Sequence, residues 1–111
     1  MEYKMHLTEK PFFMIKSGKK DIEMRLFDEK RQKIQKGDTI EFSNVETGQT
    51  INAEVIDIHK FNNFSELYSD FDKTRLGYYE DEEASPKDMS QYYSNEEIEK
   101  YGVVGIEIKK I

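Results

Sequence analysis

The stretch SGKKDIEMRL, residues 17–26, contains the clearest signals for secondary structure in the first part of the chain. Apolar residues recur at every second position from Ile22 to Leu26, which is the period of a strand with one buried face. Glu23 and Arg25 share the opposite face, so their side chains point the same way. Gly18 stands where a preceding helix would end. The stretch therefore predicts a helix end and then a half-buried strand that carries an acid beside a guanidinium.

The flanking segments predict short strands and helices in alternation, followed by a helical region and a last strand. Thr8, Asp28, Ser85 and Ser94 stand where helix N-caps are expected. Strands are expected at 3–7, 21–27, 39–44, 49–61 and 103–111, and helices at 9–17, 29–36, 64–71, 85–93 and 95–102.

The longest predicted strand, 49–61, changes its phase midway. Its apolar positions alternate from Ile51 to Val55 and then shift to Ile56 and Ile58. A β-bulge produces such a shift and bends the strand, and small barrels turn their corners in this way. The predicted fold is of the α+β class: a small, partly open β-barrel of five to six strands with short helices inserted, formed by residues 1–111 as one domain.

Composition excludes several kinds of site. The chain contains no cysteine, so disulfides, thiolate metal sites and a cysteine nucleophile are excluded. No apolar run approaches the roughly 20 residues of a membrane helix. The opening segment MEYKMHL lacks the basic and apolar parts of a signal peptide. We therefore expect a cytoplasmic protein with no membrane partner.

Charge is distributed unevenly along the chain, whose formal net charge is -6. Residues 10–36 contain nine lysines and arginines against four acids, whereas residues 62–102 contain four basic and eleven acidic residues. An anionic ligand is therefore expected to bind near the first third of the chain, where positive charge is in excess. The acidic run Glu80–Glu83 is expected to be a solvated loop and argues against a long nucleic-acid duplex as the ligand.

The positions of Gly18, Lys20, Glu23 and Arg25 match the pattern G-x-K-x-x-E-x-R. The chain thereby resembles the ASCH domain family, a branch of the PUA-like β-barrels. The resemblance extends to HLTEKPFFMIKSG before the pattern, to RLFDEKRQKIQKGDTIEFSN after it and to YGVVGIEI near the end. It implies a PUA-like barrel whose cleft, between the barrel and a helical insertion, is lined by Lys20, Glu23 and Arg25.

Members of this family include domains proposed to bind RNA, a bacterial ribonuclease and a small amidohydrolase that deacetylates acetylcytidine. In the amidohydrolase a threonine, with the family's lysine beside it, takes the place held here by Glu23, so this chain lacks a hydroxyl at that position. The resemblance implies a catalytic role for Lys20 and Glu23 only if the chain is an enzyme. An acid from Glu80–Glu83 that folded over Lys20 would correspond to the distant acid of the amidohydrolase.

The three side chains also suggest a chemistry of their own. Lys20 and Arg25 suit a phosphate or a carbonyl oxygen, which Arg25 can bind through its planar fork. Glu23 can accept hydrogen bonds from a nucleobase amine, hold Arg25 in place or act as a general base. The plainer alternative is an ion pair between Glu23 and Arg25 on a solvated strand, which contributes no more than about 1 kcal/mol.

Two further side chains are candidates for ligand contact. His6 lies on the first predicted strand, and Tyr78 lies in the helical insertion, where its ring can stack on a base. His59 is the only other histidine, and neither histidine has a clear acidic partner at ligand spacing, so we predict no bound metal and no cofactor. A ribonuclease would still need Mg²⁺ or Mn²⁺, held by carboxylates and substrate oxygens.

Three functions stay open at this stage. The favoured one is a binding module for RNA, a single nucleotide or a modified nucleoside. The second is an enzyme that uses the same cleft, either a hydrolase of acylated pyrimidine nucleosides or a metal-assisted ribonuclease. The third is a protein-interaction domain whose acidic insertion meets a basic partner.

Overall fold

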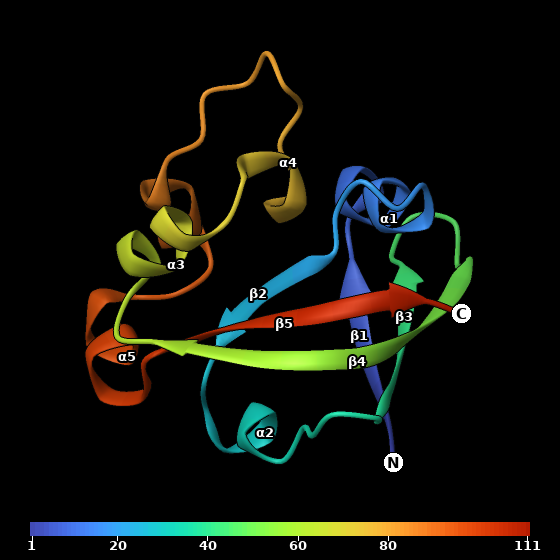
Figure 1. The fold of residues 1–111 in the computed structure, drawn as a ribbon, viewed down its shortest axis with the longest axis horizontal. Helices are drawn as coiled ribbons and strands as arrows, with labels where there is room; N and C mark the ends of the chain where they lie inside the picture. The colour runs from blue at the N-terminus through green and yellow to red at the C-terminus, as the bar shows by residue number, and fades with distance from the viewer.

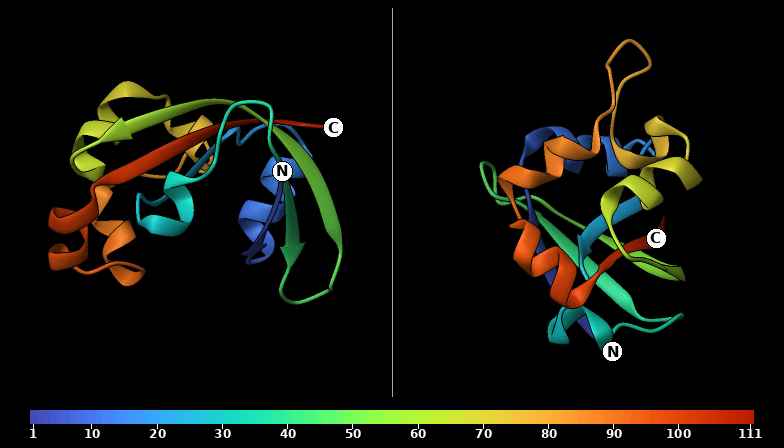
Figure 2. Two further views of the ribbon diagram at one scale, coloured as in Figure 1. Left: turned by 90° about the horizontal axis from the view of Figure 1, so that it is seen from below. Right: turned by 90° about the vertical axis from the view of Figure 1, so that its left-hand side faces the viewer.

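The computed structural model describes residues 1–111, and its five strands form one curved sheet in the order β1-β3-β4-β5-β2. The strands are β1 (Glu2–Leu7), β2 (Ile22–Leu26), β3 (Thr39–Asn44), β4 (Thr50–Phe61) and β5 (Val103–Lys110). β1 and β3 are parallel, and all other neighbours are antiparallel. β4 bends strongly along its length, so the sheet curls into a half-barrel (Figure 2). The predicted α+β fold with a partly open barrel is confirmed.

Short helices connect the strands. They are α1 (Glu9–Lys16), α2 (Glu29–Gln32), α3 (Phe64–Asp70), α4 (Lys73–Leu76), the 3₁₀ helix η1 (Pro86–Gln91) and α5 (Asn95–Tyr101). Figure 1 shows α1 at one end of the sheet and α3 and α5 at the other. Asp28, Ser85 and Ser94 cap their helices as predicted, whereas Thr8 occupies the N-cap position of α1 without a side-chain hydrogen bond.

The predicted bulge in β4 is present. The pairing of β4 with β5 shifts its register between Val55 and Asp57, and Ile56 is 40% exposed. Ile56 was expected to face inward with Ile58, but only Ile58 packs against the core. The extra residue reverses the phase of the strand, so Asp57 and His59 fall on the outward-facing positions.

Each face of the sheet carries an apolar core. One core lies between the strands and α1, which contributes Phe12 and Ile15. The other lies between β2, β5 and the helical segment 64–101, and Ile22 and Leu67 belong to it. The sequence predicted that β2 is half-buried, but both of its sides are covered. The helical segment packs on the side of Ile22, whereas Glu23 pairs with Ile106 of β5 and therefore lies on the side of the first core, where it is only 3% exposed.

Two helices differ from their predictions. α2 ends at Gln32 rather than at residue 36. Ile34, the only apolar residue of that segment, turns into the first core, and a single apolar side chain cannot anchor a second helical turn. α4 was not predicted, and Gly77 ends it with a φ of +109°. No helix in the structure combines the length and the apolar character needed to cross a membrane.

Candidate functional site

A cleft of about 410 Å³ opens between the start of α1, strand β2 and the segment from α4 to η1. The cleft is lined by all five residues predicted to contact a ligand, namely His6, Lys20, Glu23, Arg25 and Tyr78. Their assembly in one place is observed, and their role in binding stays a prediction.

Glu23 contacts both cations of the signature pattern. Nζ of Lys20 lies 3.1 Å from Oε1 of Glu23, and Nε of Arg25 lies 2.7 Å from Oε2. The side chains of Lys20 and Glu23 are 7% and 4% exposed. The plainer alternative, an ion pair on a solvated strand, is therefore wrong, because the three charges form a buried cluster. We call Lys20, Glu23 and Arg25 the buried triad.

Backbone carbonyls hold the two cations from their other sides. Nζ of Lys20 donates to the carbonyl of Leu76 at 3.2 Å, and Nη2 of Arg25 donates to the carbonyl of His6 at 3.3 Å. Leu76 ends α4 and His6 lies in β1, so the buried triad connects the helical insertion to the first strand. Lys20 precedes β2, which begins at Ile22, and strand alternation therefore does not determine its direction.

Gly77 makes the close approach of Lys20 possible. Its φ of +109° lies in the left-handed region, and a Cβ at this position would lie 3.1 Å from Cδ of Lys20. Tyr78, the next residue, lies in the predicted helical insertion, and the tight turn at Gly77 brings both Tyr78 and Lys20 to the cleft.

Opposing effects set the pKa values of Glu23 and Arg25. Burial alone would raise the pKa of Glu23, but the charges of Lys20 and Arg25 and their hydrogen bonds outweigh burial and lower that pKa below its ordinary value of 4.5. Burial alone would lower the pKa of Arg25, and the charge and hydrogen bond of Glu23 raise it. Glu23 is therefore a carboxylate at neutral pH, and both of its oxygens are already engaged.

Tyrosines line the opposite wall of the cleft. The hydroxyl of Tyr78 donates to Oδ2 of Asp88 at 2.6 Å and lies 2.8 Å from the hydroxyl of Tyr68. Burial, reinforced by the hydrogen bond to Asp88, raises the pKa of Tyr78, so its phenol is neutral at physiological pH. Tyr92 lines the same cleft and is 62% exposed. One ring is thus held rigidly, and a second is free to stack on a ligand.

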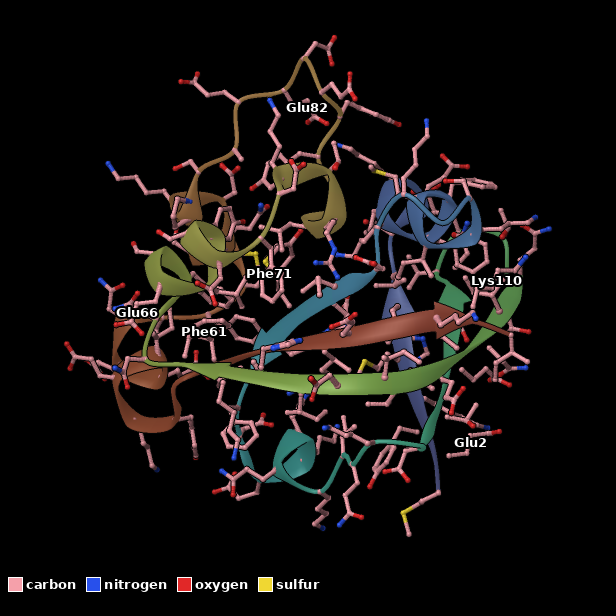
Figure 3. The ribbon with its side chains drawn as sticks, in the orientation of Figure 1. Glu2, Phe61, Glu66, Phe71, Glu82 and Lys110 are labelled. Carbon is pink, nitrogen blue, oxygen red and sulfur yellow. The ribbon has the colours of Figure 1, made fainter.

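The acidic loop closes one end of the cleft through Lys10. Nζ of Lys10 lies 2.5 Å from Oε1 of Glu82, and Nζ of Lys73 donates to the backbone carbonyl of Glu82 at 2.6 Å. Glu82 lies on the loop that rises above the sheet in Figure 3. The contact to Lys10 differs from the arrangement in which an acid of Glu80–Glu83 folds over Lys20, because Lys20 is bound by Glu23 instead.

The formal charges that line the cleft cancel. Its three cationic side chains are matched by three anionic ones: Lys10, Lys20 and Arg25 against Glu23, Glu82 and Asp88. Sequence reasoning missed Lys10, Tyr68 and Asp88. Lys10 and Glu82 are 72 residues apart, and no spacing signal connects such distant partners before the fold is known.

Comparison with known proteins assigns the chain to a family. The profile of the ASCH domain matches residues 5–111. The crystal structure of hypothetical protein PH0355 is similar with a TM-score of 0.84 and 36% identity, and the match covers 100% of both chains. The solution NMR structure of protein PF0455 from Pyrococcus furiosus has a TM-score of 0.76 and 35% identity, with coverage of 100% of this chain and 98% of that one. The comparison with curated proteins gave no match. The resemblance drawn from the signature pattern is confirmed, and the chain belongs to the ASCH domain family.

Proposed function

We propose that the cleft binds an uncharged nucleobase, presented by a nucleotide, by a modified nucleoside or by an unpaired position of RNA. The observation that supports this most is the combination of cancelling charges with aromatic rings and fixed hydrogen-bond donors in one cleft. A base is flat, uncharged and edged with donors and acceptors. Stacking and edge hydrogen bonds are the interactions by which proteins bind it.

Arg25 is the main candidate for contact with the edge of the base. Its Nε and Nη2 are engaged by Glu23 and by the carbonyl of His6, and a guanidinium has further N–H groups to offer. The Arg25 side chain is 17% exposed, so it reaches the cleft while its orientation is held from behind. Glu23 acts in this proposal as a positioning residue, because both of its oxygens are already engaged by Lys20 and Arg25.

The charge balance leads us to expect that phosphates stay outside the cleft. The lining offers no surplus of positive charge, and the chain as a whole carries a net charge of -6. Attraction to a phosphate is therefore weak, and so is the salt dependence that phosphate contacts impose. A nucleoside and its 5′-triphosphate should bind with similar affinity.

Ligand-observed NMR on the full chain tests this proposal, with the four ribonucleosides, N4-acetylcytidine and the matching 5′-triphosphates as probes. We expect each nucleoside and its triphosphate to bind within about threefold of each other. Tyr92→Ala should weaken binding by roughly 5- to 150-fold, as expected for about 1–3 kcal/mol per stacked base.

Phe13→Ala is the matched control, because Phe13 is also exposed, at 42%, and does not line the cleft. We expect this variant to bind as the wild type does. The proposal fails if no probe binds, if triphosphates bind much more tightly than nucleosides, or if Phe13→Ala weakens binding as much as Tyr92→Ala.

A feature of Thr8 supports a second candidate function, the hydrolysis of an acylated nucleoside. Thr8 lines the cleft at the N-cap of α1, yet its hydroxyl makes no capping hydrogen bond. A hydroxyl beside an amine can act as a nucleophile when the amine is deprotonated, so Lys20 would have to lose the proton that it shares with Glu23 before it could accept the proton of Thr8. Chromatography of N4-acetylcytidine incubated with the protein would detect cytidine as the product.

Thr8→Val separates the two candidate functions. The variant loses no capping bond, so it should fold, and under the hydrolysis hypothesis it should form no product. Absence of product from the wild type excludes hydrolysis of this substrate and leaves the binding proposal standing. Equal product from both proteins would exclude Thr8 as the nucleophile.

A further inference from the structure

Three side chains of metal-ligand type meet on the sheet where β4 pairs with β5, and none of them lines the cleft. Asp57 of β4 lies directly opposite Glu107 of β5, and His59 follows two residues later on β4. The bulge creates this arrangement. Without the register shift after Val55, the inward phase of the strand would continue to Asp57 and His59.

The distances between the potential ligand atoms suit a small metal ion. Nε2 of His59 lies 2.9 Å from Oε1 of Glu107 and 4.0 Å from Oδ2 of Asp57. One ligand atom from each residue lies within 4.8 Å of the others. Ligands bound to tetrahedral zinc at about 2.0–2.2 Å are separated by roughly 3.4 Å, so the observed distances to the histidine lie on either side of that value.

Each carboxylate is held through one oxygen and presents the other to His59. Oδ1 of Asp57 accepts a hydrogen bond from the backbone N–H of Ile58 at 2.8 Å, and Oδ2 is the oxygen nearest His59. Oε2 of Glu107 lies 3.4 Å from Nη2 of Arg75, and Oε1 contacts His59. With one oxygen held in this way, the other oxygen of each acid faces Nε2 of His59.

The surroundings also fix the histidine and leave the site open to solvent. The ring of His59 packs edge-on against Phe71, with centroids 5.1 Å apart and an interplanar angle of 69°. The three side chains are 28–39% exposed, so solvent can supply a further ligand.

We propose that Asp57, His59 and Glu107 bind a transition-metal dication of the zinc class, with water completing the coordination. One imidazole nitrogen with two carboxylate oxygens favours Zn²⁺, Co²⁺ or Ni²⁺ over Mg²⁺ and Ca²⁺. Lys36 and Arg75 stay on the outer oxygens and partly neutralise the acids, which weakens the attraction for the metal. The sequence predicted no metal because neither histidine had a clear acidic partner, and the fold provides two partners for His59.

Isothermal titration calorimetry of the untagged, metal-free protein tests this site with ZnCl₂ and, separately, with MgCl₂. We expect one Zn²⁺ per chain and no heat from Mg²⁺. His59→Gln should weaken zinc binding by at least about tenfold. His6→Gln is the matched control, because His6 is the other histidine and lies outside the cluster, and it should bind zinc as the wild type does.

Thermal unfolding with and without ZnCl₂ shows whether the variant is folded. Zinc should raise the melting temperature of the wild type and of His6→Gln but not that of His59→Gln, whose metal-free melting temperature should stay close to that of the wild type. The proposal is overturned if the wild type takes up no zinc at millimolar concentration, if His59→Gln binds zinc as tightly, or if His6→Gln loses binding equally.

Discussion

Replacing Glu23 with glutamine removes the single negative charge between Lys20 and Arg25 and keeps the size of the side chain. Glu23 is 3% exposed and Lys20 7%, so water cannot replace the lost charge. Removing one partner of a buried ion pair costs about 3–5 kcal/mol. We expect the lower end, about 3 kcal/mol, because the carbonyls of Leu76 and His6 still accept hydrogen bonds from the two cations.

Urea unfolding followed by circular dichroism measures this loss. With a slope of about 2 kcal/mol per molar urea, a loss of about 3 kcal/mol lowers the midpoint by about 1.5 M. Glu54→Gln is the matched control, because Glu54 is an exposed acid on β4 with no ion pair. That variant should stay within about 0.5 kcal/mol of the wild type.

A double variant tests whether the loss comes from an unpaired buried charge. Lys20→Met combined with Glu23→Gln removes both members of the pair, and only Arg25 of the buried triad remains. The double variant should lose less stability than the two single variants together, because neither partner is left unpaired. Simple additivity would contradict the coupling that the 3.1 Å contact between Lys20 and Glu23 implies.

The effect should also depend on pH in a defined direction. The pKa of Glu23 in the folded protein lies below its ordinary value of 4.5, so its contribution to the free energy of unfolding is fully present above pH 4.5. The contribution is lost as the pH falls through the lowered pKa. The difference between wild type and Glu23→Gln should therefore shrink in acid, and a difference that grows in acid, or equal midpoints at pH 7, would refute the reasoning.

Three further variants have defined outcomes. Gly77→Ala should lower stability by about 1–2 kcal/mol in urea unfolding, because alanine is strained at a φ of +109° and its Cβ meets Lys20; an unchanged midpoint contradicts this. Tyr78→Phe should lose about 1 kcal/mol, because Asp88 loses its donor, and the same assay measures it. Lys10→Gln should speed hydrogen exchange at the amide of Tyr79, which donates to Glu82, and unchanged exchange would show that Lys10 does not hold the loop.

The architecture of this chain could be predicted from local patterns. Alternation located the strands, capping residues located most helices, and the phase shift in 49–61 located the bulge. The signature pattern predicted that Lys20, Glu23 and Arg25 line one cleft, as they do. These features depend on neighbours close in sequence or on a family pattern, so they can be recognised in a single chain.

Contacts between distant segments could not be predicted. The burial of Glu23 depends on the pairing of β2 with β5, which places Glu23 beside Ile106 on the side of the first core. The sequence of β2 alone does not show this pairing. The contact between Lys10 and Glu82 depends on where the tertiary fold places the acidic loop relative to α1. Asp57 shares a face of β4 with His59 by alternation, but Glu107 became the second partner only through the register in which β4 pairs with β5 after the bulge.

Amide chemical-shift mapping of the ¹⁵N-labelled protein with the nucleoside that binds best tests the central claim most directly. The account predicts shifts concentrated at residues that line the cleft: Thr8, Lys20, Glu23–Arg25, Gly77–Tyr78, Met89 and Gln91–Tyr93. A second groove, lined by residues that include Asn62, Asn63 and Lys100, provides an internal comparison. Shifts confined to that groove, or none at millimolar nucleoside, would contradict the claim that the cleft binds a nucleobase.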